Sequence, residues 1–318
     1  MEVIGTVPPR LTDFQQLLAD ARITGAAARE RTDRACDVAY WQSIAPATTI
    51  STRPVAIAAA PPSGAIATAV ADLQRDGYCH LRGALDPALV QAANAAIDAV
   101  VAAKWPPLFA FVFDALWLLA RSPAVVDFAT GALGGGYSLI PHVWVHVVRP
   151  ARDSAGFGAH VESFDATGRL TTWLALTDAT LESGCIYLLP RWAAPREVVE
   201  RFDRADRFTR SELIDALHAV RPLPARTGDL LSWGFDIVHW GGYATARAAE
   251  LRSVSFELIA ASATPAAHEV PLLPLDRLPS FDERLRTLGW CIHEYADHDP
   301  LMSRFLEIAD ALQRVTPS

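Results

Sequence analysis

The stretch "YSLIPHVWVHVVRP" (residues 137–150) decides the fold class, because it is a long run rich in β-branched and aromatic residues that ends at a turn. Segments of the same character, bounded by Gly, Pro or Asp, follow later in the chain: "LTTWLALTDA", "GCIYLLP", "GDLLSWG" and "LRSVSFELIA". Strands that follow one another without alternating helices favour an antiparallel sandwich or jelly roll over a parallel sheet. We therefore expect a mainly β core with flanking helices.

The regions on either side of the strands divide the chain into three parts. Residues 1–63 are predicted to form a helical and extended appendage, a lid or a dimer contact, in which Thr12 and Gln15 make a capping box. Residues 64–265 hold the β core and its leading helices. Residues 266–318 return to a helical pattern, and we expect this C-terminal extension to pack on the core.

Composition and charge exclude several classes of protein. The chain has 318 residues, 51% of them apolar, and a formal net charge of -8, which argues against a nucleic-acid or anionic-membrane surface. No basic patch followed by an apolar stretch opens the sequence, so we expect no secretory signal. The four cysteines are far apart and show no C-x-x-C pairing, which favours reduced thiols in a cytoplasmic protein.

Three residues have the types and spacing of a metal site. His160 and Glu162 stand two apart in "GAHVESFD" (residues 158–165), so on an extended strand both side chains share one face. Such a pair alone is more often a polar turn than a site. His239 follows the strand "GDLLSWG", and in a double-stranded β-helix the ends of distant strands meet at one mouth. Two His and one carboxylate form the facial triad of non-haem Fe(II) oxygenases, which leaves the opposite side of the metal open.

An arginine downstream of His239 fits the same chemistry. Arg252 opens the strand "LRSVSFELIA", and a guanidinium can grip a carboxylate through two parallel hydrogen bonds. The distal carboxylate of 2-oxoglutarate requires such a partner. Arg247 is a competitor for this role. We prefer Arg252, because a strand would aim its side chain inward.

Residues 64–262 resemble the phytanoyl-CoA dioxygenase-like Fe(II)/2-oxoglutarate oxygenases. The resemblance rests on the order and spacing of three stretches: "LQRDGYCHLRGALDPALVQAANAAID" (residues 73–98), "LTTWLALTDATLESGCIYLLP" (residues 170–190) and "GDLLSWGFDIVHWGGYAT" (residues 228–245). It implies a double-stranded β-helix of the jelly-roll or cupin-like type. It also implies that His160, Glu162 and His239 bind iron and that Arg252 holds 2-oxoglutarate.

The chain departs from the family pattern at three places. Glu162 stands where most relatives have Asp, and the extra methylene should shift the carboxylate without abolishing binding. Arg191 and Trp192 replace the usual Ser-His after the "LLP" turn, and Ala244 lies near the position of the usual Asn. Contacts next to the iron are therefore expected to differ from those of relatives.

Further side chains are candidates for the cavity wall. His142, Trp144 and His146 alternate with Val143, Val145 and Val147, so one face is core and the other is either pocket or a second buried surface. We assign His142 and Trp173 to 2-oxoglutarate, with plain core as the alternative for Trp173. The remaining substrate-pocket candidates are Trp144, His146, Phe164, Arg191, Arg196 and Trp240. Arg191 and Arg196 belong to an Arg-rich run that is more typical of a solvated helix face.

The resemblance implies a dioxygenase that uses Fe(II), 2-oxoglutarate and O₂ to oxidise an unactivated C–H bond of a small-molecule metabolite, such as one of secondary metabolism. Hydroxylation is the default outcome, with succinate and CO₂ as co-products. Desaturation, cyclisation and epimerisation start with the same step and stay open. A zinc-dependent hydrolase, which uses the same ligand types, and a non-catalytic metal-binding module are the alternatives from other classes. We expect a monomer or homodimer that binds neither nucleic acid nor membrane.

Overall fold

The computed structural model describes residues 22–55, 63–150, 154–164, 167–203, 208–297 and 299–315. The helix expected around Thr12 and Gln15 lies outside these residues. No helix in the described ranges is long and apolar enough to cross a membrane. All four cysteines are free thiols, as the sequence predicted, and three of them are buried.

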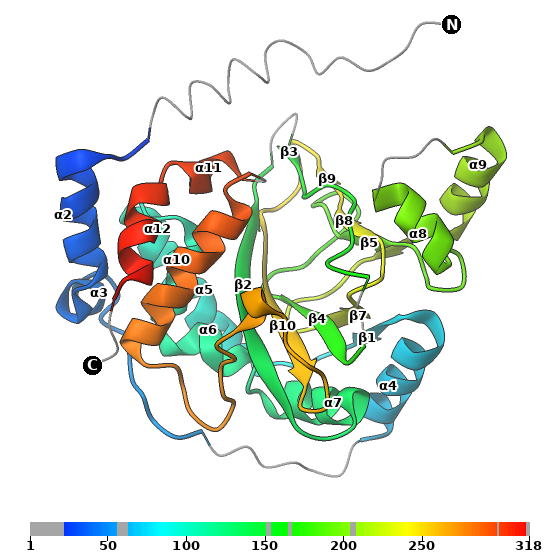
Figure 1. The fold of residues 1–318 in the computed structure, drawn as a ribbon, viewed down its shortest axis with the longest axis horizontal. Helices are drawn as coiled ribbons and strands as arrows, with labels where there is room; N and C mark the ends of the chain where they lie inside the picture. Colours follow the sequence, from blue (N-terminus) through cyan, green and yellow to red (C-terminus); the bar gives the residue numbers. More distant parts are fainter. Residues whose placement is uncertain are drawn as a thin grey trace, which may run out of the picture.

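The larger of the two main sheets has five antiparallel strands in the order β1-β7-β4-β10-β2. Its strands are β1 (Tyr78–Leu81), β2 (Tyr137–Val148), β4 (Arg169–Ala175), β7 (Leu230–Gly234) and β10 (Leu251–Ala260). Neighbours in this sheet come from distant parts of the chain, so that β10 pairs with both β2 and β4. Figure 1 shows the long green β2 beside β10 at the centre of the molecule.

The smaller sheet lies opposite the larger one. It has the order β6-β5-β8, and a two-stranded ladder of β3 and β9 extends the same side. Its strands are β3 (Ser154–Ala155), β5 (Ile186–Leu188), β6 (Arg221–Leu223), β8 (His239–Gly241) and β9 (Tyr243–Ala244). Two antiparallel sheets whose strands alternate along the chain form a jelly roll, and flanking helices surround it. The predicted fold class is confirmed.

Helices cover the outer face of the larger sheet. They are α4 (Gly64–Asp76), α5 (Pro87–Ala102), η1 (Pro107–Val112), α6 (Asp114–Leu119) and α7 (Pro123–Leu133), while α10 (Phe281–Tyr295) lies beside β2, the edge strand of this sheet. Sequence determines their ends: Gly77 ends α4 in the left-handed conformation at φ 83°, and Asp86 caps α5 ahead of Pro87. Val145, Val254 and Phe256 point from the sheet into the core that these helices complete.

The remaining helices lie at the two ends of the barrel. They are α2 (Gly25–Ala35), α3 (Val38–Ile44), α8 (Arg196–Asp203), α9 (Arg210–Ala219), η2 (Ala267–Glu269), α11 (Pro300–Ser303) and α12 (Leu306–Gln313). The capping box predicted at Thr209 and Glu212 is present at the start of α9. Figure 1 shows α8 and α9 projecting from the side opposite to α10 and α12.

The described part of the N-terminal segment packs against the C-terminal helices. The Ile23 amide donates to the Arg304 carbonyl at 3.0 Å, and the Gly25 amide donates to Glu307 Oε1 at 3.0 Å. A buried ion pair between Arg284 and Asp114, at 2.8 Å, ties α10 to α6. In Figure 1 the blue α2 accordingly lies beside the red α12. The three-part division of the chain stays a prediction, and residues 22–35 are joined to the C-terminal extension.

Candidate metal centre

His160, Glu162 and His239 converge at the mouth of the barrel, as their spacing predicted. One ligand atom from each lies within 4.8 Å of the others. The backbone creates this closeness, because the His160 amide donates to the His239 carbonyl at 3.1 Å and the His239 amide donates back at 3.0 Å. The Glu162 amide donates to the Phe235 carbonyl at 3.1 Å. Segments 79 residues apart are thus joined as one bridge of a sheet.

Hydrogen bonds set the orientation of both imidazoles. His160 Nδ1 lies 2.8 Å from the Gly158 carbonyl, and His239 Nδ1 lies 2.9 Å from the Ile237 carbonyl. A carbonyl oxygen only accepts, so each Nδ1 carries a proton and donates it. In the neutral ring Nε2 then holds the lone pair, which is the arrangement of histidines that bind a metal. Burial lowers the pKa of His239 to about 4, so its imidazole is neutral at pH 7.

Glu162 is largely buried, with its side chain 13% exposed, and within the described residues only one of its two carboxylate oxygens has hydrogen-bond partners. Its Oε1 accepts from Thr171 Oγ1 at 2.6 Å and from Trp233 Nε1 at 3.3 Å. Within the described structure, no donor reaches its buried Oε2. Burial raises the pKa of Glu162 to about 7, although His160 and the Thr171 hydrogen bond oppose this rise. A cation beside Oε2 would supply the missing partner, so two imidazoles and one carboxylate fit a divalent metal.

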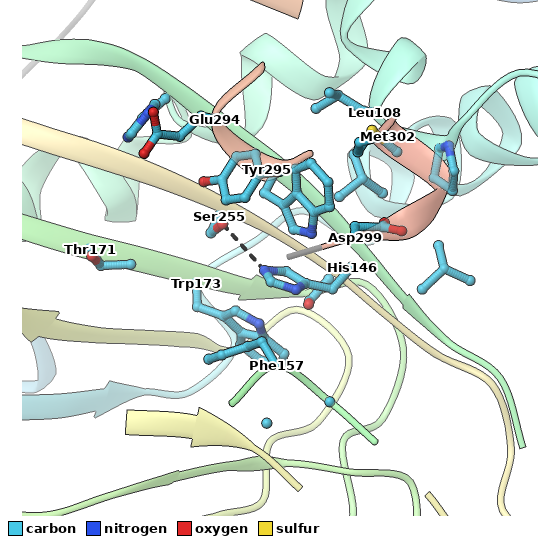
Figure 2. A pocket seen from close by; sticks show the side chains of 18 of the residues that line it. Leu108, His146, Phe157, Thr171, Trp173, Ser255, Glu294, Tyr295, Asp299 and Met302 are labelled. Atoms are coloured by element: carbon cyan, nitrogen blue, oxygen red, sulfur yellow. Dashed lines mark hydrogen bonds between the residues drawn. The ribbon is translucent and has the colours of Figure 1, made fainter. Parts of the chain in front are cut away.

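A large cavity opens beside the three ligands, between the inner face of the larger sheet and the helices at its edge. Its volume is about 1420 Å³, above the range of about 300–1,000 Å³ that is common for small-molecule pockets. Figure 2 shows Trp173 and Phe157 below His146 on one side and Tyr295, Asp299 and Met302 on the other. The cavity has room for a chelating co-substrate and a metabolite together.

The alternating residues of β2 line this cavity, as expected. His142, Trp144 and His146 line it, while Val143 and Val145 belong to the main core cluster, with Val145 also touching the cavity. Trp144 packs on Tyr295 of α10, with 4.0 Å between the ring centroids. Burial lowers the pKa of His146 to about 3, with the nearby metal-site histidines as further causes. Trp173 also lines the cavity.

His142 forms an ion pair with a residue that the sequence did not single out. Its Nδ1 donates to Glu257 Oε2 at 3.0 Å. Burial lowers the pKa of His142, but the Glu257 charge and hydrogen bond outweigh it, so that the net shift is upward. Its Nε2 is buried, and no partner for it is found in the part of the chain that the structure describes.

Arg252 does not face the cavity, so the prediction that its strand aims it inward is wrong. Its guanidinium lies 2.7 Å from Asp98 of α5 and 2.6 Å from Glu250, on the outer side of the sheet. The inward residues of β10 are Leu251, Ser253, Ser255 and Glu257. Arg247 lies in the exposed turn before β10 and does not line the cavity either. The assignment of Arg252 to 2-oxoglutarate is therefore corrected.

Four other pocket candidates lie outside the cavity lining. Phe164 and Trp240 belong to a separate apolar cluster with Leu189. Arg191 pairs with Asp236, and Arg196 pairs with Glu200, one turn further along α8. The two arginines have the local salt bridges of a solvated surface.

Several residues of the site were not found by sequence reasoning. Thr171 and Trp233 hold the Glu162 carboxylate, and Phe157 packs between His146 and both metal-site histidines. Thr171 could have been identified from the sequence, because it stands two residues before Trp173 on the same strand face. Tyr295 could not have been identified in this way, since it lies 135 residues beyond His160 and no pattern links the two.

Comparisons with known proteins support the fold. No family model matches the chain, and no curated protein sequence matches it. Among solved structures, it is similar to the non-heme alpha ketoglutarate dependent epimerase SnoN from nogalamycin biosynthesis, at 21% identity and a TM-score of 0.51 over 68% of this chain and 98% of that one.

The carbocyclase SnoK from nogalamycin biosynthesis matches at 21% identity and a TM-score of 0.51, over 70% of this chain and 97% of that one. The apo form of the non-heme monooxygenase ThoJ matches at 14% identity and a TM-score of 0.51, over 77% and 98%. At these identities the likeness shows the fold. The chain has the same fold as these structures.

Proposed function

We propose that this protein is an Fe(II)- and 2-oxoglutarate-dependent oxygenase, of the phytanoyl-CoA dioxygenase-like type, that oxidises a C–H bond of a small-molecule metabolite. The observation that carries the proposal is the convergence of His160, Glu162 and His239 beside a large cavity. One ligand atom from each residue lies within 4.8 Å of the others, and within the described residues the buried Oε2 of Glu162 has no hydrogen-bond partner. Three protein ligands on one side leave coordination positions open for a chelating 2-oxo acid and O₂.

The bound iron would supply oxidation by O₂. One oxygen atom enters the product as C–OH, the other enters succinate, and 2-oxoglutarate provides two electrons as it loses CO₂. The chain's own residues orient the ligands: backbone carbonyls hold the two imidazoles, and Thr171 and Trp233 hold Glu162. These two donors also brace the longer Glu side chain, where most relatives use Asp. Aromatic walls such as Trp173 and Phe157 limit the access of water.

A metabolite of considerable size is the best-supported substrate class. The cavity of about 1420 Å³ exceeds what 2-oxoglutarate alone would fill. One of the similar structures is SnoN in complex with Fe³⁺, alpha ketoglutarate and nogalamycin RO. Hydroxylation is our default outcome, and epimerisation and ring closure, the reactions named for SnoN and SnoK, are the alternatives. We expect the enzyme to act in the cytoplasm as a monomer or homodimer.

Anaerobic titration tests the proposal. Fe(II) followed by 2-oxoglutarate should produce a weak metal-to-ligand charge-transfer band in the visible region, and His239→Ala should abolish it. His218→Ala is the matched control, because His218 is an exposed histidine on α9. Tight Zn²⁺ binding without any band from Fe(II) and 2-oxoglutarate would contradict the proposal and favour a hydrolase.

A further inference from the structure

The inner face of β10 contains no basic side chain. Leu251, Ser253, Ser255 and Glu257 face the cavity, while Arg252 on the outer face pairs with Asp98 and Glu250. The strand that runs next to the metal centre therefore presents two hydroxyls, one aliphatic side chain and one carboxylate. A dicarboxylate co-substrate would meet no guanidinium from this strand.

The other strands around the cavity do not provide a replacement. The further basic side chains that line it, Arg31, Lys104, Arg149 and Arg304, come from segments outside the barrel strands, and Arg149 is 62% exposed and pairs with Glu250. Among β2, β4, β5, β7, β8 and β10, the only arginines are Arg169 and Arg252, and no lysine occurs. Arg169 lines the cavity but is clamped by Glu269, with its Nε 2.7 Å from Oε1 and its Nη2 2.9 Å from Oε2. Its Nη2 also donates to the Thr264 carbonyl at 2.8 Å. To bind a second carboxylate, Arg169 would have to break a buried ion pair, which is strongly unfavourable.

Neutral groups line the end of the cavity at the start of β10. Ser253 is fully buried, and within the described residues its Oγ has no hydrogen-bond partner. The sheet register places Ser253 opposite His146, and Ser255 opposite Trp173. Leu251 and Ile186 complete the lining with apolar surface. Phe157 connects this end to the metal centre, because its ring lies 5.4 Å from that of His146 and 5.3 Å from that of His160.

We propose that this neutral end of the cavity is the subsite for the tail of the 2-oxo acid co-substrate, and that it accepts an uncharged tail about as well as the carboxylate of 2-oxoglutarate. The inference rests on the proposed function. Burying a carboxylate without a cation carries a desolvation penalty that hydroxyl and indole donors offset only in part. An aliphatic tail carries no such penalty and gains contact with Leu251, Ile186 and Trp173.

The chemistry balances for either co-substrate. With 4-methyl-2-oxopentanoate, the acid loses CO₂ and takes one oxygen atom of O₂ to become 3-methylbutanoate. The other oxygen atom enters the C–H bond that is oxidised, as it does with 2-oxoglutarate. The choice of co-substrate changes only the carboxylic acid that is released.

Binding measurements on the anaerobic Fe(II) protein test this inference without turnover. We expect the dissociation constants of 2-oxoglutarate and 4-methyl-2-oxopentanoate to lie within about tenfold of each other. Arg252→Gln should change neither constant by more than about twofold. Ser253→Ala should weaken 2-oxoglutarate by about fivefold, the usual effect of one lost hydrogen bond, and leave the aliphatic acid unchanged.

The outcomes separate this inference from the proposed function. A preference of more than about 100-fold for 2-oxoglutarate, or its loss in Arg252→Gln, would overturn the neutral subsite and leave the oxygenase proposal intact. A protein that binds Fe(II) but neither acid would overturn the proposed function itself.

Discussion

The two faces of β10 have opposite chemistry although their residues alternate along one strand. Val254 and Phe256 are buried against helices on the outer face. Ser253 and Ser255, between and beside them, face the cavity. The outer face stabilises the barrel, and the inner face shapes a binding site. Substitutions on the two faces should therefore affect different properties, stability on one and ligand binding on the other.

The largest effect is expected on the outer face. Phe256 is 1% exposed and packs edge to face on Phe111. Phe256→Ala should lower the free energy of unfolding by about 3–5 kcal/mol, because it leaves a cavity in the core. Urea denaturation measures this loss. Ser255→Ala, one position away on the inner face, is the control and should change stability by less than about 1 kcal/mol. Equal losses would mean that the two faces are not distinct.

The second-largest effect is expected in how the stability of the metal-free protein depends on pH. The pKa of Glu162 is raised by burial to about 7 in the folded chain, above its ordinary value of 4.5. The folded state then binds more protons than the unfolded state in this range, so stability falls as the pH rises from about 4.5 to 7. Over this range the free energy of unfolding falls by about 2–3 kcal/mol in total.

Comparison with Glu162→Gln isolates this effect. His239 has a lowered pKa and contributes in the opposite direction between pH 4 and 6.5, and it is present in both proteins. The difference in unfolding free energy between wild type and Glu162→Gln should therefore shift with pH, in favour of the Gln protein at pH 7. Parallel pH profiles would show that Glu162 titrates normally. Saturating Fe(II) should remove the disadvantage of the wild type.

A third prediction compares neighbours on β4. Thr171 faces inward and donates to Glu162, whereas Thr172 faces outward and is buried near Ser232. Thr171→Val should weaken Fe(II) binding by about 10–100-fold, as is usual when a group that orients a metal ligand is lost. Thr172→Val should leave Fe(II) affinity unchanged. Calorimetric titration of both variants checks this, and the same loss in both would argue for general distortion of the strand.

The smallest effect is expected at Arg252. Its ion pairs involve Asp98, whose side chain is 65% exposed, and pairs of this kind contribute about 0–1 kcal/mol. Arg252→Gln should therefore lower the unfolding free energy by at most about 1 kcal/mol, with no change in Fe(II) affinity. A large loss of stability in urea would show that Arg252 anchors α5 to the sheet more firmly than its contacts indicate.

The features that the sequence predicted correctly are those that depend on local patterns. The run at residues 137–150 identified a strand, and the alternation of His142, Trp144 and His146 with valines identified its two faces. The convergence of His160 and His239 also followed, because in a jelly roll the ends of distant strands meet. Each of these inferences needs only the residue types and their spacing.

Arg252 was misplaced because the face of a strand residue depends on register. A shift of one residue moves every side chain of a strand to the opposite face. The turn before β10 sets that register, and a bulge between Phe256 and Leu258 changes it again. Neither feature has a clear sequence signature. Glu257 was missed for the same reason, and Tyr295 because its helix reaches the cavity only through tertiary packing.

Both ends of the described chain contribute to one wall of the cavity. Ile23 and Arg31 line it from one end, Met302 and Phe305 from the other, and the amides of Ile23 and Gly25 hydrogen-bond across the junction. Recombination that exchanged only one of these segments between related chains would break those bonds. Exchanged together, the two segments would change which small molecules fit the cavity and would leave His160, Glu162 and His239 in place. Selectivity and reactivity could then diverge independently within one barrel.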